Sequence, residues 1–249
     1  MLLKSQVKYI QSLGQKKFRD EEAVFIAEGP KIVSELLGSE ATPLLNLYAV
    51  KEWTDEHHQL VSSLPSSKLA VVELSELKRI SELSTPNQVL GLFRKPAEKV
   101  FRVQGQVSLV LDEIQDPGNM GTIIRTADWF GMSTIFCSLN SADAFNPKVV
   151  QSTMGSISRV QVIYRDLHAL FVDNDNISVY ATSLRGQDVF KMKPLQEGFI
   201  IIGNESKGVS PELLAKANQQ IGIPKNGAAE SLNAAVAAGI ILSRLVKIG

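Results

Sequence analysis

Residues 111–131, LDEIQDPGNMGTIIRTADWFG, lead from an apolar run through a Pro-Gly turn directly into a helix. The tetrapeptide 116–119, DPGN, has the residues of a type II turn, because proline fixes φ at the second position and glycine accepts a positive φ at the third. Asn119 is then the predicted N-cap. Arg125 lies off the apolar stripe of this helix, so it is free to face a site at the edge of a strand. The stripe consists of Met120, Ile123, Ile124, Ala127 and Phe130.

An arginine at this position in an amphipathic helix is more often a solvated charge or an ion-pair partner than a functional group. A second segment of the same kind makes a functional role for Arg125 more favourable. In FIIIGNESKGVSP, 199–211, a short buried strand ends at Ile202, and a polar loop with Gly203 and Gly208 leads to a helix opened by Pro211. The phosphate-loop pattern is rejected, because Val209 stands where its lysine belongs.

A third segment, IGIPKNGAAESLNAAVAAGIIL, 221–242, repeats the arrangement of strand, loop and helix. The strand is expected to end at Ile223 and the helix to begin near Ser231, with Leu232 and Asn233 in its first turn. The apolar run at 234–242 is well short of the roughly 20 residues that span a membrane, so a buried or subunit-interface helix is predicted.

These segments resemble the three signature motifs of the SpoU/TrmH family of RNA ribose 2′-O-methyltransferases, in the SPOUT superfamily. The matching residues are Asn119, Gly121, Arg125 and Thr126 in the first motif, Gly203, Asn204, Glu205 and Gly208 in the second, and Ile223, Pro224, Ser231, Leu232 and Asn233 in the third. One departure is the pair Ala234 and Ala235, where many members have a small polar residue. The resemblance covers about residues 105 to 249 and implies an α/β domain with a deep trefoil knot.

Independently of the family, apolar strands alternate with helical patterns through this part of the chain. That alternation predicts a parallel sheet covered by helices, with a ligand beyond the carboxyl ends of the strands. The strands are expected near 107–112, 133–137, 160–164, 177–182, 199–202 and 220–223, and the helices near 119–131, 145–152, 166–172, 210–217 and 231–246. No GxGxxG pattern follows a strand, which disfavours a dinucleotide-type fold.

The resemblance also implies the cofactor, S-adenosylmethionine, and the residues around it. The cofactor is expected to be lined by Thr182, Ser183, Leu184, Ile202, Gly203, Gly208, Ile223, Leu232 and Asn233. The catalytic set carried over from the motifs is Arg125, Asn119, Glu205, Ser231 and Asn233. Because a guanidinium seldom gives up its proton, Arg125 is assigned electrostatic stabilisation and phosphate or ribose positioning, with Glu205 orienting it. Cap and core roles are the competing interpretation of these residues, and both roles can hold at once.

The first hundred residues are expected to form a separate unit. Residues 1–95 have the pattern of a small α/β domain, 96–104 a charged, proline-bearing linker, and 105–249 the knotted domain. The stretch FIAEGPKIVSELL, 25–37, resembles the opening of an RNA-binding domain of the ribosomal-protein L30e type. The predicted RNA contacts are Lys4, Lys8, Lys16, Lys17 and Arg19, although a charge run is usually a solvated face. A second basic cluster is Arg94, Lys95, Lys99 and Arg102.

The composition bears on RNA affinity, disulfides, metal sites and location. Lys plus Arg and Asp plus Glu both number 26, so the chain is formally neutral and any RNA affinity is expected to be local and moderate. The single cysteine, Cys137, and three histidines without metal-ligand spacing predict no disulfide and no metal site. With no signal-peptide core at the N-terminus, a cytoplasmic location is expected, with no membrane partner.

The sequence therefore predicts a homodimeric ribose 2′-O-methyltransferase acting on structured RNA, with ribosomal RNA ahead of transfer RNA. The two-domain layout resembles the rRNA-modifying branch of the family. Two alternatives remain: a non-catalytic RNA-binding relative, and a small-molecule enzyme that has no use for the basic clusters.

Overall fold

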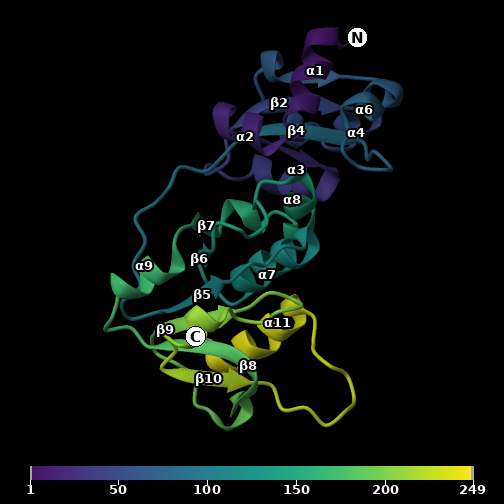
Figure 1. Cartoon of the computed structure of the whole chain (residues 1–249). Helices are drawn as coiled ribbons and strands as arrows, with labels where there is room; N and C mark the ends of the chain where they lie inside the picture. Colours follow the sequence, from purple (N-terminus) through teal and green to yellow (C-terminus); the bar gives the residue numbers. More distant parts are fainter. Residues whose placement is uncertain (1, 248–249) are drawn as a thin grey trace. The chain divides into compact units, whose positions relative to one another are not determined.

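The structure is a computed structural model that describes residues 2–247. The chain divides into two compact units (Figure 1). The first contains the chain up to Ala97 together with Asp143–Ser158, and the second contains Glu98–Ala142 and the chain from Arg159 onward. The segment 143–158 thus packs with the first unit, although it lies well inside the second half of the sequence.

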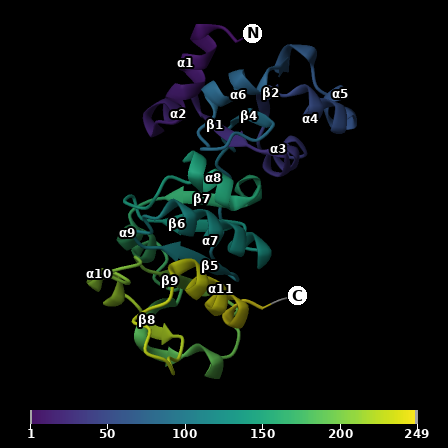
Figure 2. The same cartoon turned by 90° about the vertical axis from the view of Figure 1, so that its right-hand side faces the viewer.

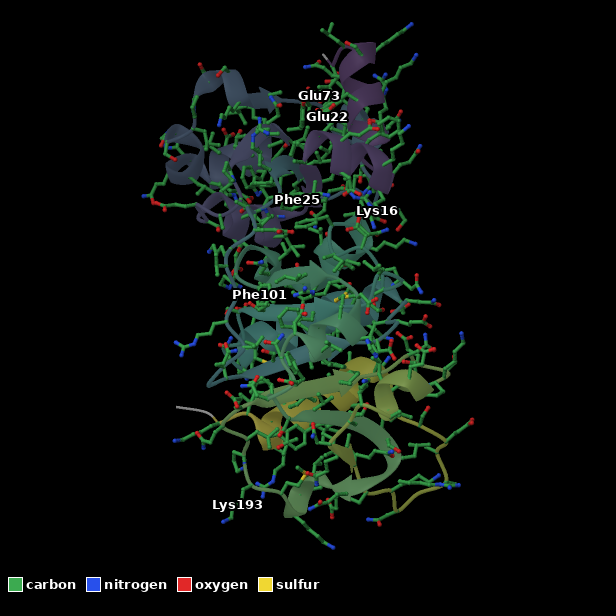
Figure 3. The ribbon with its side chains drawn as sticks, turned by 60° about the vertical axis from the view of Figure 1, so that its left-hand side comes forward. Lys16, Glu22, Phe25, Glu73, Phe101 and Lys193 are labelled. Atoms are coloured by element: carbon green, nitrogen blue, oxygen red, sulfur yellow. The ribbon has the colours of Figure 1, made fainter. Side chains whose placement is uncertain are left out.

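A four-stranded mixed sheet, in the order β1-β4-β2-β3, forms the first unit. The central strand β4 (Val89–Arg94) runs antiparallel to β1 (Val24–Glu28) and β2 (Leu44–Ala49), and β3 (Leu69–Val71) is parallel to β2. Phe25 of β1, labelled in Figure 3, is fully buried between the rings of Phe93 and Phe145, at 5.8 and 5.1 Å between ring centroids. The helices of this unit are α1 (Lys4–Ser12), α2 (Lys16–Glu22), α3 (Pro30–Leu37), α4 (Lys51–Glu56), α5 (His58–Ser62), α6 (Leu74–Ile80) and α8 (Pro147–Thr153), with 3₁₀ turns at Ser66–Lys68 and Ser156–Ser158.

One predicted RNA contact in the first unit, Arg19, is wrong. Its side chain is buried, its Nη2 lies 2.6 Å from Asp143 Oδ2, and its Nη1 donates to the carbonyls of Leu13 and Gly14. Because this guanidinium is buried and bonded inside the protein, it cannot contact a phosphate, and Arg19 joins segment 143–158 to α2 instead. The other four predicted contacts, Lys4, Lys8, Lys16 and Lys17, are exposed.

The second unit contains a six-stranded sheet in the order β10-β8-β9-β5-β6-β7, with every described pair of neighbours parallel. The strands are β5 (Val107–Leu111), β6 (Thr134–Cys137), β7 (Gln161–Tyr164), β8 (Val179–Asp188), β9 (Gly198–Ile202) and β10 (Gln219–Gly222). Its helices are α7 (Pro117–Trp129), α9 (Leu167–Val172), α10 (Pro211–Leu214) and α11 (Ala234–Leu245), with a 3₁₀ turn at Val189–Lys191. The prediction of an α/β fold with a parallel sheet is confirmed.

Aromatic side chains fill the core beneath this sheet. Phe101, labelled in Figure 3, packs edge-on against Phe136 at 5.1 Å between centroids, and Phe136 and Phe171 both contact Phe199. Cys137, at the end of β6, is buried and free, and burial raises the pKa of its thiol well above the ordinary value. Within residues 2–247, no helix is long and apolar enough to cross a membrane.

One irregularity in the sheet shapes the site. Strand β10 pairs with β8 at Gln220 opposite Ala181, and the next residue, Ile221, is opposite Gln187. The intervening residues of β8, 182–186, therefore bulge out of the ladder. At its end, Gly186 passes so close to β10 that a Cβ would lie 2.3 Å from the Ile221 carbonyl carbon, which only glycine allows.

The two motif helices begin differently from the prediction. Helix α7 begins at Pro117, and its N-cap is Asp116, whose carboxylate accepts from the Asn119 backbone N–H at 2.8 Å. A type II turn is therefore absent at 116–119, and Asn119 is in the first turn of the helix. Helix α11 begins at Ala234 with Asn233 as its N-cap, not near Ser231. In both cases the side-chain oxygen that reaches the free backbone N–H groups decides the helix start.

Candidate active site

A cavity of about 630 Å³ lies at the carboxyl ends of β9 and β10, beside the bulge in the middle of β8. Its walls are the β8 bulge, the loop after β9 and the long loop from β10 to α11, drawn in yellow in Figures 1 and 2. Ten of the predicted site residues line it: Thr182, Ser183, Leu184, Ile202, Gly203, Glu205, Gly208, Ile223, Ser231 and Leu232. The volume is within the usual range for small-molecule sites. The three other predicted residues, Asn119, Arg125 and Asn233, are not part of its lining.

The loop after β9 is closed by its own backbone. Asn204 and Gly208 exchange two hydrogen bonds, of 3.0 and 2.9 Å, which pinch residues 205–207 into a tight turn. Gly208 has φ of +73°, and a Cβ on Gly203 would lie 2.1 Å from the Val209 nitrogen. Both glycines are therefore required by the shape of this wall of the cavity.

The side chain of Asn204 holds the same loop against the segment that follows β5. Its Oδ1 accepts from the backbone N–H groups of Ser206 and Lys207, and its Nδ2 donates to the Glu113 carbonyl at 2.8 Å. Glu113 has φ of +54°, a conformation that costs a residue with a Cβ about 1 kcal/mol or more.

Asp112, which is buried, accepts from the Ser210 N–H at 2.7 Å and so fixes the far end of the same loop. Sequence reasoning missed both Asp112 and Glu113. The signal that would have found them is a pair of acids directly after a buried strand.

A chain of side-chain amides connects the three motifs. Glu205 Oε1 accepts from Asn119 Nδ2 at 2.9 Å, and Asn119 Oδ1 accepts from Asn233 Nδ2 at 2.7 Å. Asn233 Oδ1 in turn accepts from the N–H groups of Ala235 and Val236 at the start of α11. Each amide donates in one direction and accepts in the other, so the network fixes the orientation of all three side chains. The expected pairing of Glu205 with Arg125 is wrong, because Glu205 is bonded to Asn119 instead.

Arg125 is on α7, and α11 packs along this helix in Figures 1 and 2. The side chain is exposed, and within residues 2–247 it has no hydrogen-bond or ion-pair partner. Its cation is therefore available to an anion from outside the chain. Ser231 is exposed in the loop before α11 and forms no cap bond.

The lining has the composition of a site for an organic ligand with both apolar and polar parts. Ile202, Ile223 and Leu232 provide apolar surface, and Thr182 and Ser183 provide hydroxyl groups. Across the part of the chain that the structure describes, no group of three His, Cys, Asp or Glu side chains could hold a metal ion.

Comparisons with known proteins agree with this site. Residues 106–243 match the SpoU rRNA Methylase family, and residues 4–91 match the MRM3-like substrate binding domain. The chain is 35% identical to the 23S rRNA (guanosine(2553)-2′-O)-methyltransferase RlmP of Bacillus subtilis, over 96% of this chain and 95% of that protein.

Solved structures give the same result. A putative RNA methyltransferase of the TrmH family from Porphyromonas gingivalis superposes with a TM-score of 0.84 at 36% identity, covering 98% of both chains. An AdoMet-bound rRNA methyltransferase from Sinorhizobium meliloti superposes with a TM-score of 0.83 at 31% identity, covering 98% of this chain and 95% of that one. The protein therefore belongs to the SpoU rRNA methylase family.

Proposed function

We propose that this protein transfers a methyl group from S-adenosylmethionine to the 2′-oxygen of a ribose in ribosomal RNA. The observation that supports this most directly is the cavity at the carboxyl ends of β9 and β10, whose walls include residues of the second and third motifs. The first motif is joined to those walls through Asn119. Two of the relatives that match more than nine-tenths of the chain are named as 2′-O-methyltransferases of 23S rRNA.

The lining fits S-adenosylmethionine in its chemistry. Ile202, Ile223 and Leu232 offer the apolar contact that an adenine ring needs, while Thr182 and Ser183 can hydrogen-bond its polar groups. When bound, this cofactor supplies the electrophilic methyl group.

The protein's own residues must deal with the charge that develops on the ribose. As the 2′-hydroxyl loses its proton, Arg125 stabilises the growing negative charge, acting as a cation and not as a base, because guanidinium keeps its proton in proteins. Glu205 lines the cavity with Oε1 held by Asn119, which leaves Oε2 to accept a hydrogen bond from the ribose. Asn119 and Asn233 are positioning residues that hold this carboxylate.

The first unit is proposed to bind the RNA around the target. We retain residues 1–95 as an L30e-like RNA-binding domain, 96–104 as a linker and 105–249 as the methyltransferase domain. Lys4, Lys8, Lys16 and Lys17 are exposed on α1 and α2 and can contact phosphates. Replacing Lys16 and Lys17 by Glu should lower both the RNA affinity and its dependence on salt, as measured by filter binding.

Three further features complete the proposal. A homodimer is supported by α7 and α11, which lie side by side with Trp129 85% and Val236 51% exposed. A deep trefoil knot is proposed because the three motifs resemble those of the SPOUT superfamily. A ribosomal RNA substrate supports a cytoplasmic location.

The decisive experiment is transfer of a labelled methyl group from S-adenosylmethionine to unmodified 23S rRNA, 16S rRNA and tRNA in parallel. Digestion then identifies the modified nucleotide. Label at one ribose of 23S or 16S rRNA is expected. Label in tRNA alone would change the substrate, and no label despite measured cofactor binding would favour a non-catalytic RNA-binding relative.

A further inference from the structure

The mouth of the cavity carries three cations that the motifs do not account for. Arg185 belongs to the β8 bulge, Lys207 to the loop after β9 and Lys225 to the loop after β10. All three line the cavity and all three are exposed, so they lie at its rim and not in its floor. They come from three different walls of the cavity.

These cations are not used inside the protein. Arg185 and Lys207 form hydrogen bonds in this region through their backbone N–H groups only, to Ser183 and Asn204. Within residues 2–247, none of the three side chains has a hydrogen-bond or ion-pair partner. Of the two acids in the lining, Glu205 is bonded to Asn119, and Glu230 is exposed in the same loop as Lys225. The chain as a whole is formally neutral, so this local excess of unpaired positive charge is a feature of the rim.

The chemistry of an RNA substrate supplies the matching anions. A ribose 2′-hydroxyl is on the carbon next to the one that carries the 3′-phosphate, so a 2′-oxygen cannot enter the cavity without bringing backbone phosphates to its mouth. We propose that Arg185, Lys207 and Lys225 bind the phosphates that flank the target ribose. This inference rests on the proposed function, and it assigns these residues to substrate binding at the catalytic site, apart from the lysines of the first unit.

Another anion could reach the same rim, namely the carboxylate of the methionine part of the cofactor. The two sources differ in a measurable way, because each phosphate contact to a single strand contributes about 0.7 to the slope of log affinity against log salt. Removing a contact to the cofactor carboxylate would leave that slope unchanged and would weaken binding of the cofactor measured without RNA.

The test uses the full-length protein, the variants Arg185→Gln, Lys207→Gln and Lys225→Gln, and the triple variant. The matched control is the triple change of Lys191, Lys193 and Lys216 to Gln, which alters the net charge equally at exposed positions of the second unit outside the cavity lining. Lys193 is labelled in Figure 3. Affinity for unmodified 23S rRNA is measured across a salt series, and S-adenosylmethionine affinity is measured by calorimetry without RNA.

The rim triple variant should reduce the salt slope by about 2, each single variant by about 0.7, and the control by markedly less. Cofactor affinity should stay within about twofold in every variant. An unchanged slope in the rim triple variant would overturn the proposal, and so would weakened cofactor binding without a change in slope. Both readouts are binding measurements and need no methyl transfer. An inactive wild-type protein would therefore refute the proposed function, whereas the salt slope would still test the phosphate contacts.

Discussion

At the scale of single residues, Arg125 is notable because it is exposed and has no partner within residues 2–247. A cation that stabilises a developing alkoxide is worth about a hundredfold to a thousandfold in rate when its charge is placed correctly. Arg125→Ala should therefore lower kcat at least a hundredfold and leave S-adenosylmethionine affinity unchanged, as measured by single-turnover kinetics and calorimetry. Arg125→Lys, which keeps the charge without the planar fork, should recover part of the loss. Turnover close to wild type in the alanine variant would remove Arg125 from this role.

Glu28 is a buried carboxyl in the first unit whose contribution to stability depends on pH. Burial raises its pKa, although hydrogen bonds from the Ser81 hydroxyl and the Glu82 N–H oppose the shift. Because the folded pKa lies above the unfolded one, the charged form is penalised on folding and the penalty disappears as pH falls through this window. The unfolding free energy of the wild type should therefore rise relative to that of Glu28→Gln as pH falls from 7 towards 4. Urea denaturation at each pH measures both free energies. A difference between the two proteins that stays constant from pH 7 to pH 4 would contradict this.

At the scale of elements, the N-cap of α11 gives two nearby polar residues, Asn233 and Ser231, different roles in stability. Asn233 accepts two backbone N–H groups and also donates to Asn119, whereas Ser231 forms no cap bond. Asn233→Ala should cost about 1 to 2 kcal/mol of unfolding free energy, because it removes the cap and leaves Asn119 without a donor. Ser231→Ala, the matched control, should change it by less than about 0.5 kcal/mol. Urea denaturation measures both, and equal losses would show that the helix starts earlier.

The order of the elements could be predicted from the sequence because buried parallel strands and amphipathic helices have different periods. Their ends could not be predicted as well. Asp116 and Asn119, like Ser231 and Asn233, are all acceptable caps by residue type, and only the folded geometry shows which oxygen reaches the free N–H groups. Most of the predicted cavity residues were found from their motifs, whereas the Asp112 carboxylate and the Glu113 carbonyl accept hydrogen bonds from a loop almost a hundred positions away.

At the scale of the whole molecule, the composition of the two units depends on contacts that local patterns cannot show. Arg19 and Asp143 are 124 positions apart, yet their buried ion pair joins segment 143–158 to the first unit. Arg19 looked like one of five similar cations in the sequence. Its burial distinguishes it from its neighbours, because a buried charge must be paired.

The proposed homodimer can be tested through the apolar side chains that α7 and α11 expose. Trp129 and Val236 are large exposed apolar residues on two adjacent helices, which is the type of surface that a symmetric interface buries. The double change Trp129→Glu and Val236→Glu should weaken self-association at least about thirtyfold, since a buried tryptophan hot spot contributes 2 kcal/mol or more. Val172→Glu, at an exposed valine of α9, is the control and should leave the dimer intact. Sedimentation velocity across a concentration series measures both. A wild-type monomer, or a double variant that dimerises normally, would exclude this face as the interface.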